Sequence, residues 1–323
     1  MIPIKVFKIC PNTDQVLGEY ASIQEAASTM GVDESTIRKT LDAPTRTCKN
    51  YKWRTTKLRT DVASFNGPKI LILDIETAPM EAYIWRLWKQ LIIPYQLISD
   101  WYILTWAAKW LYEDEVYSGA LSSEEAKAED DSRIMADLWH YLEQADIVVA
   151  HNGDKFDIPR IKTRLLLHDI SPPSFYKQLD TLKVVKKEFD FSSNSLDDLA
   201  KFLGIPGKFT TNFNLWKAAR NGDIKALSDM EEYNIQDVKL LEDVYLALRP
   251  WIKGHPNLDL YTDNENPLCP HCASSNVVEV DGKFVYTQAV RYTMYRCLDC
   301  GAVARGKKGV KYSNKKQISA IPR

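Results

Sequence analysis

The stretch from Lys69 to Pro79, which reads K-I-L-I-L-D-I-E-T-A-P, restricts the fold of this chain more than any other. Its apolar run is uninterrupted, which is typical of a short strand buried on both faces. Because side chains alternate along a strand, Asp74 and Glu76 project from the same face at its end. Two neighbouring carboxylates repel each other unless a cation lies between them, and hard divalent cations prefer oxygen ligands. The stretch therefore predicts a core strand that ends in a metal site, although a chance D-x-E beside a turn gives the same pattern.

Two later stretches each supply a further carboxylate. A second apolar run, Ile147–Ala150, leads into H-N-G-D-K-F-D-I-P-R, where Pro159 fits the first turn of a helix. Asp157 therefore falls at a strand-to-helix junction, where the helix N-terminus favours an anion. Farther along, Y-N-I-Q-D lies inside a long helical pattern, and Tyr233 and Asp237 share one helix face because they are four residues apart.

These three motifs resemble those of the DEDD 3′–5′ exonucleases, a family with a ribonuclease H-like fold. Its pattern is D-x-E on the first strand, an Asp in a motif shaped like H-N-x-x-F-D, and an Asp preceded by Tyr or His. The match is collinear over roughly residues 66–250, and Y-x-x-x-D is similar to the tyrosine branch, since Glu232 stands where the histidine branch has His. The resemblance implies an α/β domain, namely a ribonuclease H-like mixed sheet with helices on both faces. The four acidic positions are filled by Asp74, Glu76, Asp157 and Asp237.

The resemblance also implies a reaction. The four acids would hold two Mg²⁺ or Mn²⁺ ions and hydrolyse phosphodiesters from the 3′ end, with release of nucleoside monophosphates. Tyr233 would orient the attacking water rather than deprotonate it, because a phenol has a pKa of about 10. Asn152, in the H-N pair of the second motif, is expected to contact nucleic acid.

Residues 1–57 predict a small α+β module. Two strands are followed by Ser22 and, three residues on, Glu25, which is a capping-box pattern at a helix start. Gly31 is expected to end this helix, and Asp33 to open a second one. Two short helices around a glycine turn are typical of a helix-turn-helix unit.

Residues 2–54 resemble the modular DNA-binding repeat found beside intron-encoded homing endonuclease domains. This resemblance implies that Arg38 and Lys39, on the second helix, face DNA. A small protein-docking domain is the alternative reading of the same segment.

Two C-x2-C pairs with 24 residues between them predict a structural zinc site in residues 262–313. The segment resembles a zinc ribbon, a β domain in which one Zn²⁺ stabilises a core too small to fold alone. Strands are expected over 276–280 and 284–295, on either side of a turn at Asp281-Gly282, with a basic tail from Arg305 to Lys316. The predicted ligands are Cys269, Cys272, Cys297 and Cys300.

Charge is divided unevenly along the chain. Residues 1–60 carry 10 Lys and Arg against 6 Asp and Glu, residues 269–323 carry 10 against 3, and the middle carries 22 against 34. An acidic centre between basic ends fits a metal-dependent enzyme with nucleic-acid-binding appendages.

We expect three domains, at 1–57, 66–255 and 262–313. No apolar run is long enough to span a membrane, so a cytoplasmic protein without a membrane partner is expected.

Five tryptophans lie between residues 81 and 112. Exposed aromatic rings can stack on unpaired bases, but this density predicts that most of them pack in the core. The five are Trp85, Trp88, Trp101, Trp106 and Trp110.

Three functions fit the sequence. The first is a 3′–5′ exonuclease acting on DNA, single-stranded or at 3′ ends, in phage or mobile-element replication and proofreading, with a DNA polymerase or replisome component as partner. The second is an exoribonuclease of the same chemistry. The third is a catalytically inert nucleic-acid-binding adaptor, which the presence of all four acids and the tyrosine argues against. The choice of DNA over RNA rests on the N-terminal resemblance.

Overall fold

The computed structural model describes residues 6–9, 16–40, 47–54, 67–205 and 211–310. It divides the chain into two compact units, Met1–Phe65 and Asn66–Arg323, which we treat separately. The division into three domains stays a prediction, and residues 58–65, between the first two expected domains, lie outside the described part. Among the helices of the described part, none combines the length and the apolar character needed to cross a membrane.

The first unit is a three-stranded antiparallel sheet with two short helices. Ser22 accepts a hydrogen bond from the Glu25 N–H at the start of the first helix, and Gly31, at φ +61°, ends it, as predicted. Buried Ile37 and Trp53 pack against the first helix in a small core. The elements are β1 (Val6–Ile9), β2 (Val16–Tyr20), α1 (Ile23–Met30), α2 (Glu34–Thr40) and β3 (Lys52–Arg54), with sheet order β2-β1-β3.

The second unit is built on a five-stranded mixed sheet of order β10-β9-β4-β7-β8. β4 lies at its centre, parallel to β9 and antiparallel to β7, and β10 runs parallel to β9. The mixed sheet that the sequence predicted is therefore present. Its strands are β4 (Ile70–Thr77), β7 (Ile103–Trp110), β8 (Tyr117–Ala120), β9 (Ile147–Ala150) and β10 (Lys177–Asp180).

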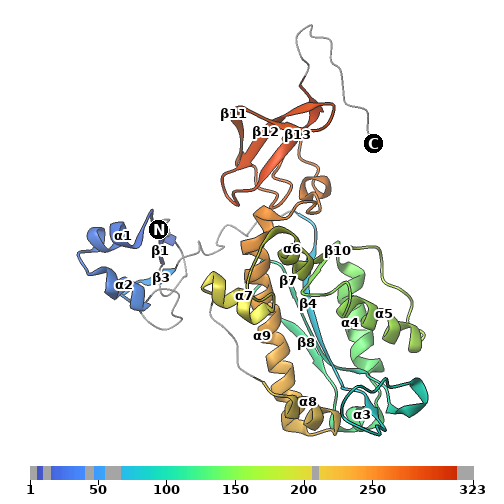
Figure 1. The fold of residues 1–323 in the computed structure, drawn as a ribbon. Coiled ribbons are helices and arrows are strands. Elements are labelled where there is room, and N and C mark those ends of the chain that lie inside the picture. The colour runs from blue at the N-terminus through green and yellow to red at the C-terminus, as the bar shows by residue number, and fades with distance from the viewer. Residues whose placement is uncertain (1–5, 10–15, 41–46, 55–66, 206–210, 311–323) are drawn as a thin grey trace. The chain divides into compact units, whose positions relative to one another are not determined.

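Helices cover both faces of this sheet, with α4 and α5 on one side and α9 on the other (Figure 1). Leu71, Leu73 and Ile75 of β4 share a buried cluster with Leu138 and Leu142 of α4. The alternate side chains of β4 point to the face covered by α9. The helices are α3 (Ser123–Ala128), α4 (Ser132–Gln144), α5 (Asp157–Leu167), α6 (Thr181–Glu188), α7 (Leu196–Leu203), α8 (Phe213–Arg220) and α9 (Ile224–Leu248), followed by the short 3-10 turns η3 (Arg249–Trp251) and η4 (Leu258–Tyr261).

Between β4 and β7 the chain leaves the sheet and forms a segment, residues 80–99, that we call the arm. It holds two short paired strands, β5 (Glu81–Ala82) and β6 (Leu97–Ser99), and the 3-10 turn η2 (Pro94–Gln96). Trp106 is buried as predicted, but Trp85 and Trp88 are 93% and 80% exposed. The prediction that most tryptophans of this region pack in the core does not extend to these two, over which no helix or strand of the described structure packs.

The C-terminal segment forms a three-stranded antiparallel sheet from β11 (Val277–Tyr286), β12 (Arg291–Cys297) and β13 (Val303–Gly309). The predicted turn at Asp281-Gly282 is wrong. The register shifts between Glu279 and Phe284, and Gly282 has φ +66°, so these residues form a bulge within one strand. The chain turns at Thr287–Val290 instead. The start of the predicted basic tail belongs to β13, and residues 311–316 lie outside the described part.

Candidate functional site

The structure brings three of the four predicted acids together. Asp74 and Glu76 come from β4 and Asp237 comes from α9, and each offers a carboxylate oxygen within 4.8 Å of the others. Asp237 is buried, whereas Asp74 and Glu76 are half-buried. Strand alternation thus puts two carboxylates on the α9 face of the sheet, and the helix supplies the third.

Two side chains that the sequence analysis missed hold these carboxylates in place. Asn234, fully buried in α9, donates from Nδ2 to Asp74 Oδ2 at 2.6 Å. Trp216 of α8 donates from Nε1 to Glu76 Oε2 at 3.1 Å. Asn234 could have been suspected, since it lies three residues before Asp237 and so on the same helix face. Nothing in the sequence near Trp216 indicated its role.

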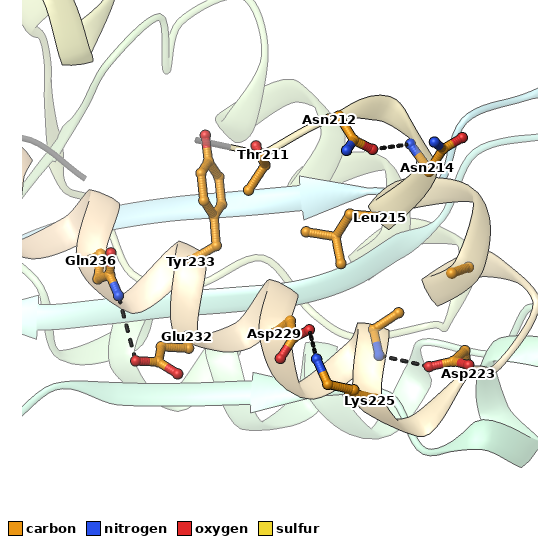
Figure 2. Close-up of a pocket in the computed structure, with 12 residues that line it drawn as sticks. Thr211, Asn212, Asn214, Leu215, Asp223, Lys225, Asp229, Glu232, Tyr233 and Gln236 are labelled. Carbon is orange, nitrogen blue, oxygen red and sulfur yellow. Dashed lines mark hydrogen bonds and ion pairs between the residues drawn. The ribbon is translucent and has the colours of Figure 1, made fainter. Parts of the chain in front are cut away.

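Tyr233 lies one helical turn before Asp237 and is half-buried. Its ring meets the Trp216 ring edge-on, with centroids 6.0 Å apart and an interplanar angle of 76°. Tyr233 also lines a groove between α8 and α9, where Figure 2 shows it projecting from α9 beside Thr211. The tyrosine is therefore held next to the acid cluster and is reachable from a surface groove.

Asp157 behaves differently from the other three acids. It is 1% exposed at the start of α5, and its Oδ1 accepts a hydrogen bond from the backbone N–H of Ile75 at 3.2 Å. Ile75 is the residue between Asp74 and Glu76, so Asp157 borders the cluster without forming part of it. Burial raises the pKa of Asp157 to about 7, because the charged carboxylate loses its hydration.

The loop before α5 is fixed by backbone contacts. The Asn152 N–H donates to Asp180 Oδ1 at 3.0 Å, and Asn152 has φ +70°, a conformation that Asn tolerates. Gly153 is needed for space, since a Cβ there would lie 2.5 Å from the Ala150 Cβ. His151 bonds Thr181 and the Asn194 carbonyl through its two ring nitrogens. The predicted contact of Asn152 with nucleic acid stays a prediction.

The donors at the acid cluster fit a divalent metal. All three are carboxylate oxygens, which Mg²⁺ and Mn²⁺ prefer as ligands. Three negative charges this close repel one another, and a cation bound among them removes that repulsion. Asp157 adjoins the cluster through Ile75. Asp74, Glu76 and Asp237 are thus the residues that would hold such an ion, with Asp157 beside them.

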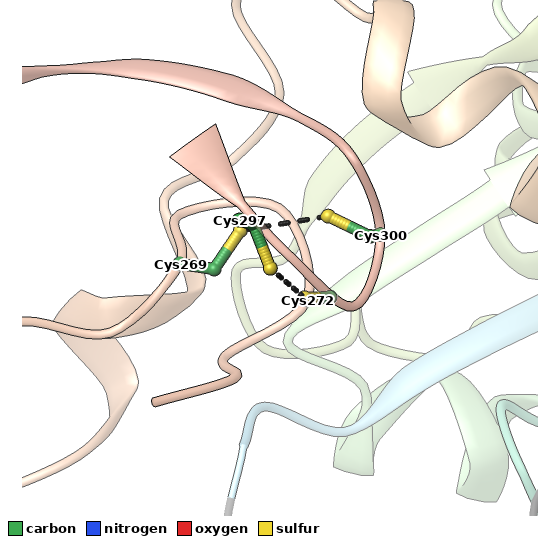
Figure 3. A group of neighbouring side chains, drawn as sticks. All are labelled: Cys269, Cys272, Cys297 and Cys300. Carbon is green, nitrogen blue, oxygen red and sulfur yellow. Dashed lines mark hydrogen bonds between the residues drawn. The ribbon is translucent and has the colours of Figure 1, made fainter. Parts of the chain in front are cut away.

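The four predicted zinc ligands form a second group (Figure 3). Cys269 Sγ lies 3.6 Å from Cys300 Sγ, and Cys272 Sγ lies 3.6 Å from Cys297 Sγ. A tetrahedron with Zn–S bonds of about 2.3 Å has sulfur–sulfur edges of about 3.8 Å, so these thiols fit Zn²⁺. His271 is not in the group, and its Nε2 lies 3.2 Å from the Ile252 carbonyl oxygen instead.

Arg38 and Lys39 are exposed on α2, as a role in DNA contact requires. Arg38 reaches Glu34, one turn earlier on the same helix, at 3.4 Å. Their binding to DNA stays a prediction.

Comparison with known proteins addresses the second unit. The family model described as the RNase_H superfamily matches residues 109–249. This range includes Asp157, Tyr233 and Asp237 and the whole of β9, whereas β4 and most of β7 precede it. Residues 109–249 are thus similar to the RNase_H superfamily, and the mixed sheet with helices on both faces agrees with that fold.

Among solved structures, the family B DNA polymerase from the hyperthermophilic archaeon Pyrobaculum calidifontis is similar, with a TM-score of 0.42 and 13% sequence identity. The match covers 57% of this chain and 25% of the polymerase, so the chain spans about a quarter of that protein's length. No curated protein matches the chain.

Proposed function

We propose that this protein is a metal-dependent 3′–5′ exonuclease that hydrolyses DNA from its 3′ end and releases nucleoside monophosphates. The observation that carries the proposal is the convergence of Asp74, Glu76 and Asp237 to within 4.8 Å, with Tyr233 one helical turn from Asp237. A domain that only binds nucleic acid gains nothing from concentrating carboxylates, since they repel phosphates unless a metal ion neutralises them.

Each side chain of the site has a distinct task. Two Mg²⁺ or Mn²⁺ ions, held by the four acids, would supply the positive charge that favours water attack and stabilises the leaving oxygen. Asn234 and Trp216 fix the orientations of Asp74 and Glu76 through one hydrogen bond each. Tyr233, whose ring contacts the indole that holds Glu76, would orient the attacking water through its hydroxyl.

Three features support nucleic acid as the substrate class, and the resemblance of the N-terminal unit to a DNA-binding repeat favours DNA. The N-terminal unit presents two exposed basic residues on a short helix, Arg38 and Lys39. Both ends of the chain carry an excess of positive charge. The C-terminal thiols would hold one Zn²⁺ and stabilise a small β domain that adds basic side chains. A role in phage or mobile-element replication, with a DNA polymerase or replisome partner, belongs to the same proposal.

A time course on a 5′-labelled single-stranded DNA oligonucleotide tests the reaction. We expect a ladder that shortens from the 3′ end with Mg²⁺ or Mn²⁺ and no cleavage with chelator. Asp74→Asn should lower the rate by more than about a hundredfold, which exceeds the usual cost of losing an outer hydrogen-bond partner. Asp169→Asn is the matched control, because Asp169 is exposed after α5 and its φ of +54° suits Asn.

The same assay separates the competing functions. A matched RNA oligonucleotide that is degraded faster than DNA would favour an exoribonuclease. If zinc-loaded protein binds the DNA and the RNA oligonucleotide but cleaves neither, an inert adaptor is favoured. Full activity of Asp74→Asn would refute the proposed site.

A further inference from the structure

The arm, residues 80–99, begins four residues after Glu76 and concentrates exposed apolar side chains. Eleven of its large apolar residues are exposed, and four of them are aromatic, with Trp85 at 93%, Tyr95 at 87%, Trp88 at 80% and Tyr83 at 74%. A contiguous exposed apolar surface of this kind marks a binding site on a folded protein.

The N-terminal end of the arm, which we call its first root, is bound to α8, the helix that also supplies a hydrogen bond to Glu76. Arg220, 6% exposed at the end of α8, donates to the Pro79 carbonyl at 2.9 Å and pairs with Glu81 at 3.2 Å. Trp216, one turn earlier on α8, donates to Glu76. The arm therefore starts at a fixed place beside the cluster, and Met80 lies within about 14 Å of Glu76 by chain length alone.

The other root is held from the side of Asp157. The Arg160 guanidinium, three residues after Asp157 on α5, lies over the Trp101 ring at 4.9 Å, just after the arm, and donates to Thr77 Oγ1, just before it. Both ends of the arm thus meet elements that carry the site.

The chemistry of the arm favours a nucleic-acid strand as its occupant. Arg86 and Lys89 are exposed among Trp85 and Trp88, whereas the acidic residue of the arm, Glu81, already pairs with Arg220. Aromatic rings interleaved with cations are the usual means of binding unpaired bases and their phosphates. Arg86 and Lys89 among exposed aromatic rings favour a polyanion that also carries aromatic bases over an apolar protein surface.

We propose that the arm is a base-stacking surface that grips the unpaired nucleotides behind the 3′ end held at Asp74, Glu76 and Asp237. The proposal rests on the proposed nuclease function, and it specifies the substrate as a single strand. Bases stack on Trp85 and Trp88, and Arg86 and Lys89 bind the phosphates between them. A duplex end has to open before its bases reach these rings.

Binding is measured on the full chain carrying Asp74→Asn, so that the strand is not digested. Tryptophan fluorescence is titrated with a thymidine oligonucleotide of about 12 nucleotides, within the usual site size, and with an abasic strand of equal length. We expect stronger quenching by the thymidine strand than by the abasic strand. Trp85→Ala and Trp88→Ala should each raise its Kd by about 5- to 150-fold, and should leave the weak binding of the abasic strand unchanged.

Trp251→Ala is the matched control variant. Trp251 is 64% exposed and lies 14 residues beyond Asp237, which is about 20 Å along a helix. This substitution should not change either affinity. The proposal is overturned if the two arm variants bind the thymidine strand as tightly as the control does. It is also overturned if they lose the same factor of affinity for the thymidine strand and for the abasic strand. If an arm variant fails to fold, the comparison of the two strands on the chain that keeps Trp85 and Trp88 still tests the proposal.

A second measurement separates the arm from the reaction. With Asp74 intact, the arm variants should hydrolyse the p-nitrophenyl ester of thymidine 5′-monophosphate as fast as the parent chain, while their KM for the oligonucleotide rises. A parent chain that hydrolyses neither substrate contradicts the nuclease proposal, but the binding titrations still decide on the arm. Self-association of the parent that the arm variants lose, without loss of strand affinity, would assign the arm to a second copy of the chain.

Discussion

Replacing Trp216 with Phe removes one hydrogen bond at the acid cluster and little else. The indole N–H donates to Glu76 Oε2 at 3.1 Å, and a Phe ring can keep the edge-on contact with Tyr233. A hydrogen bond to a charged group contributes about 1.5–3 kcal/mol, and outer partners of metal ligands typically account for 10- to 100-fold in affinity or activity. We therefore expect Trp216→Phe to weaken Mn²⁺ binding or lower kcat by about 10- to 100-fold.

The assay for this variant is isothermal titration with Mn²⁺, combined with oligonucleotide digestion at saturating metal. Trp139→Phe is the matched control, because it also removes one indole hydrogen bond, from Nε1 to the Ser171 carbonyl at 2.7 Å, at a place outside the acid cluster. The control should keep parental Mn²⁺ affinity and kcat. If Trp216→Phe matches the parent in both, or if the two variants lose activity equally, the indole does not position Glu76.

Two further predictions concern pH and zinc. Burial raises the pKa of Asp157 to about 7, so its proton competes with a metal ion, and Mn²⁺ affinity should rise with pH up to about 7. The metal-free folded state should lose stability as pH rises through the same value, because the carboxyl of the unfolded chain is already ionised. Asp157→Asn should remove both dependences, and unchanged pH profiles in that variant would refute the assignment. Native mass spectrometry should find one Zn²⁺ per chain, and Cys297→Ser should lose it. Cys48→Ser should keep it, because the Cys48 thiol is buried outside the four-cysteine group. Zinc retained in Cys297→Ser would contradict this site.

The elements that carry the acids were predictable because each follows from a local rule. An apolar run defined β4, strand alternation put Asp74 and Glu76 on one face, and helical spacing placed Tyr233 with Asp237. The orientation of Asp157 was not predictable in this way. Its carboxylate points to the Ile75 N–H because of the packing of α5 against β4, which no spacing in the motif specifies.

Other features were missed because they depend on contacts between distant segments. Trp216 lies 17 residues before Tyr233 on a separate helix, and only the packing of α8 on α9 directs its N–H to Glu76. The exposure of Trp85 and Trp88 was missed because composition favours burial of tryptophan, whereas no element in the described structure packs over the arm. The bulge at Gly282 was mistaken for a turn because Asp-Gly suits both, and only strand pairing distinguishes them.

The alternation in β4 also decides how the sheet finds its register. Ile70 to Leu73 are apolar on both faces, so a slip of one residue would cost this run little hydrophobic burial. The same slip would turn Asp74 and Glu76 away from α9 and into the cluster of Leu138 and Leu142, where unpaired carboxylates are strongly unfavourable. The two acids therefore exclude the wrong alignment of the central strand, so the residues of the candidate site also specify the folded state.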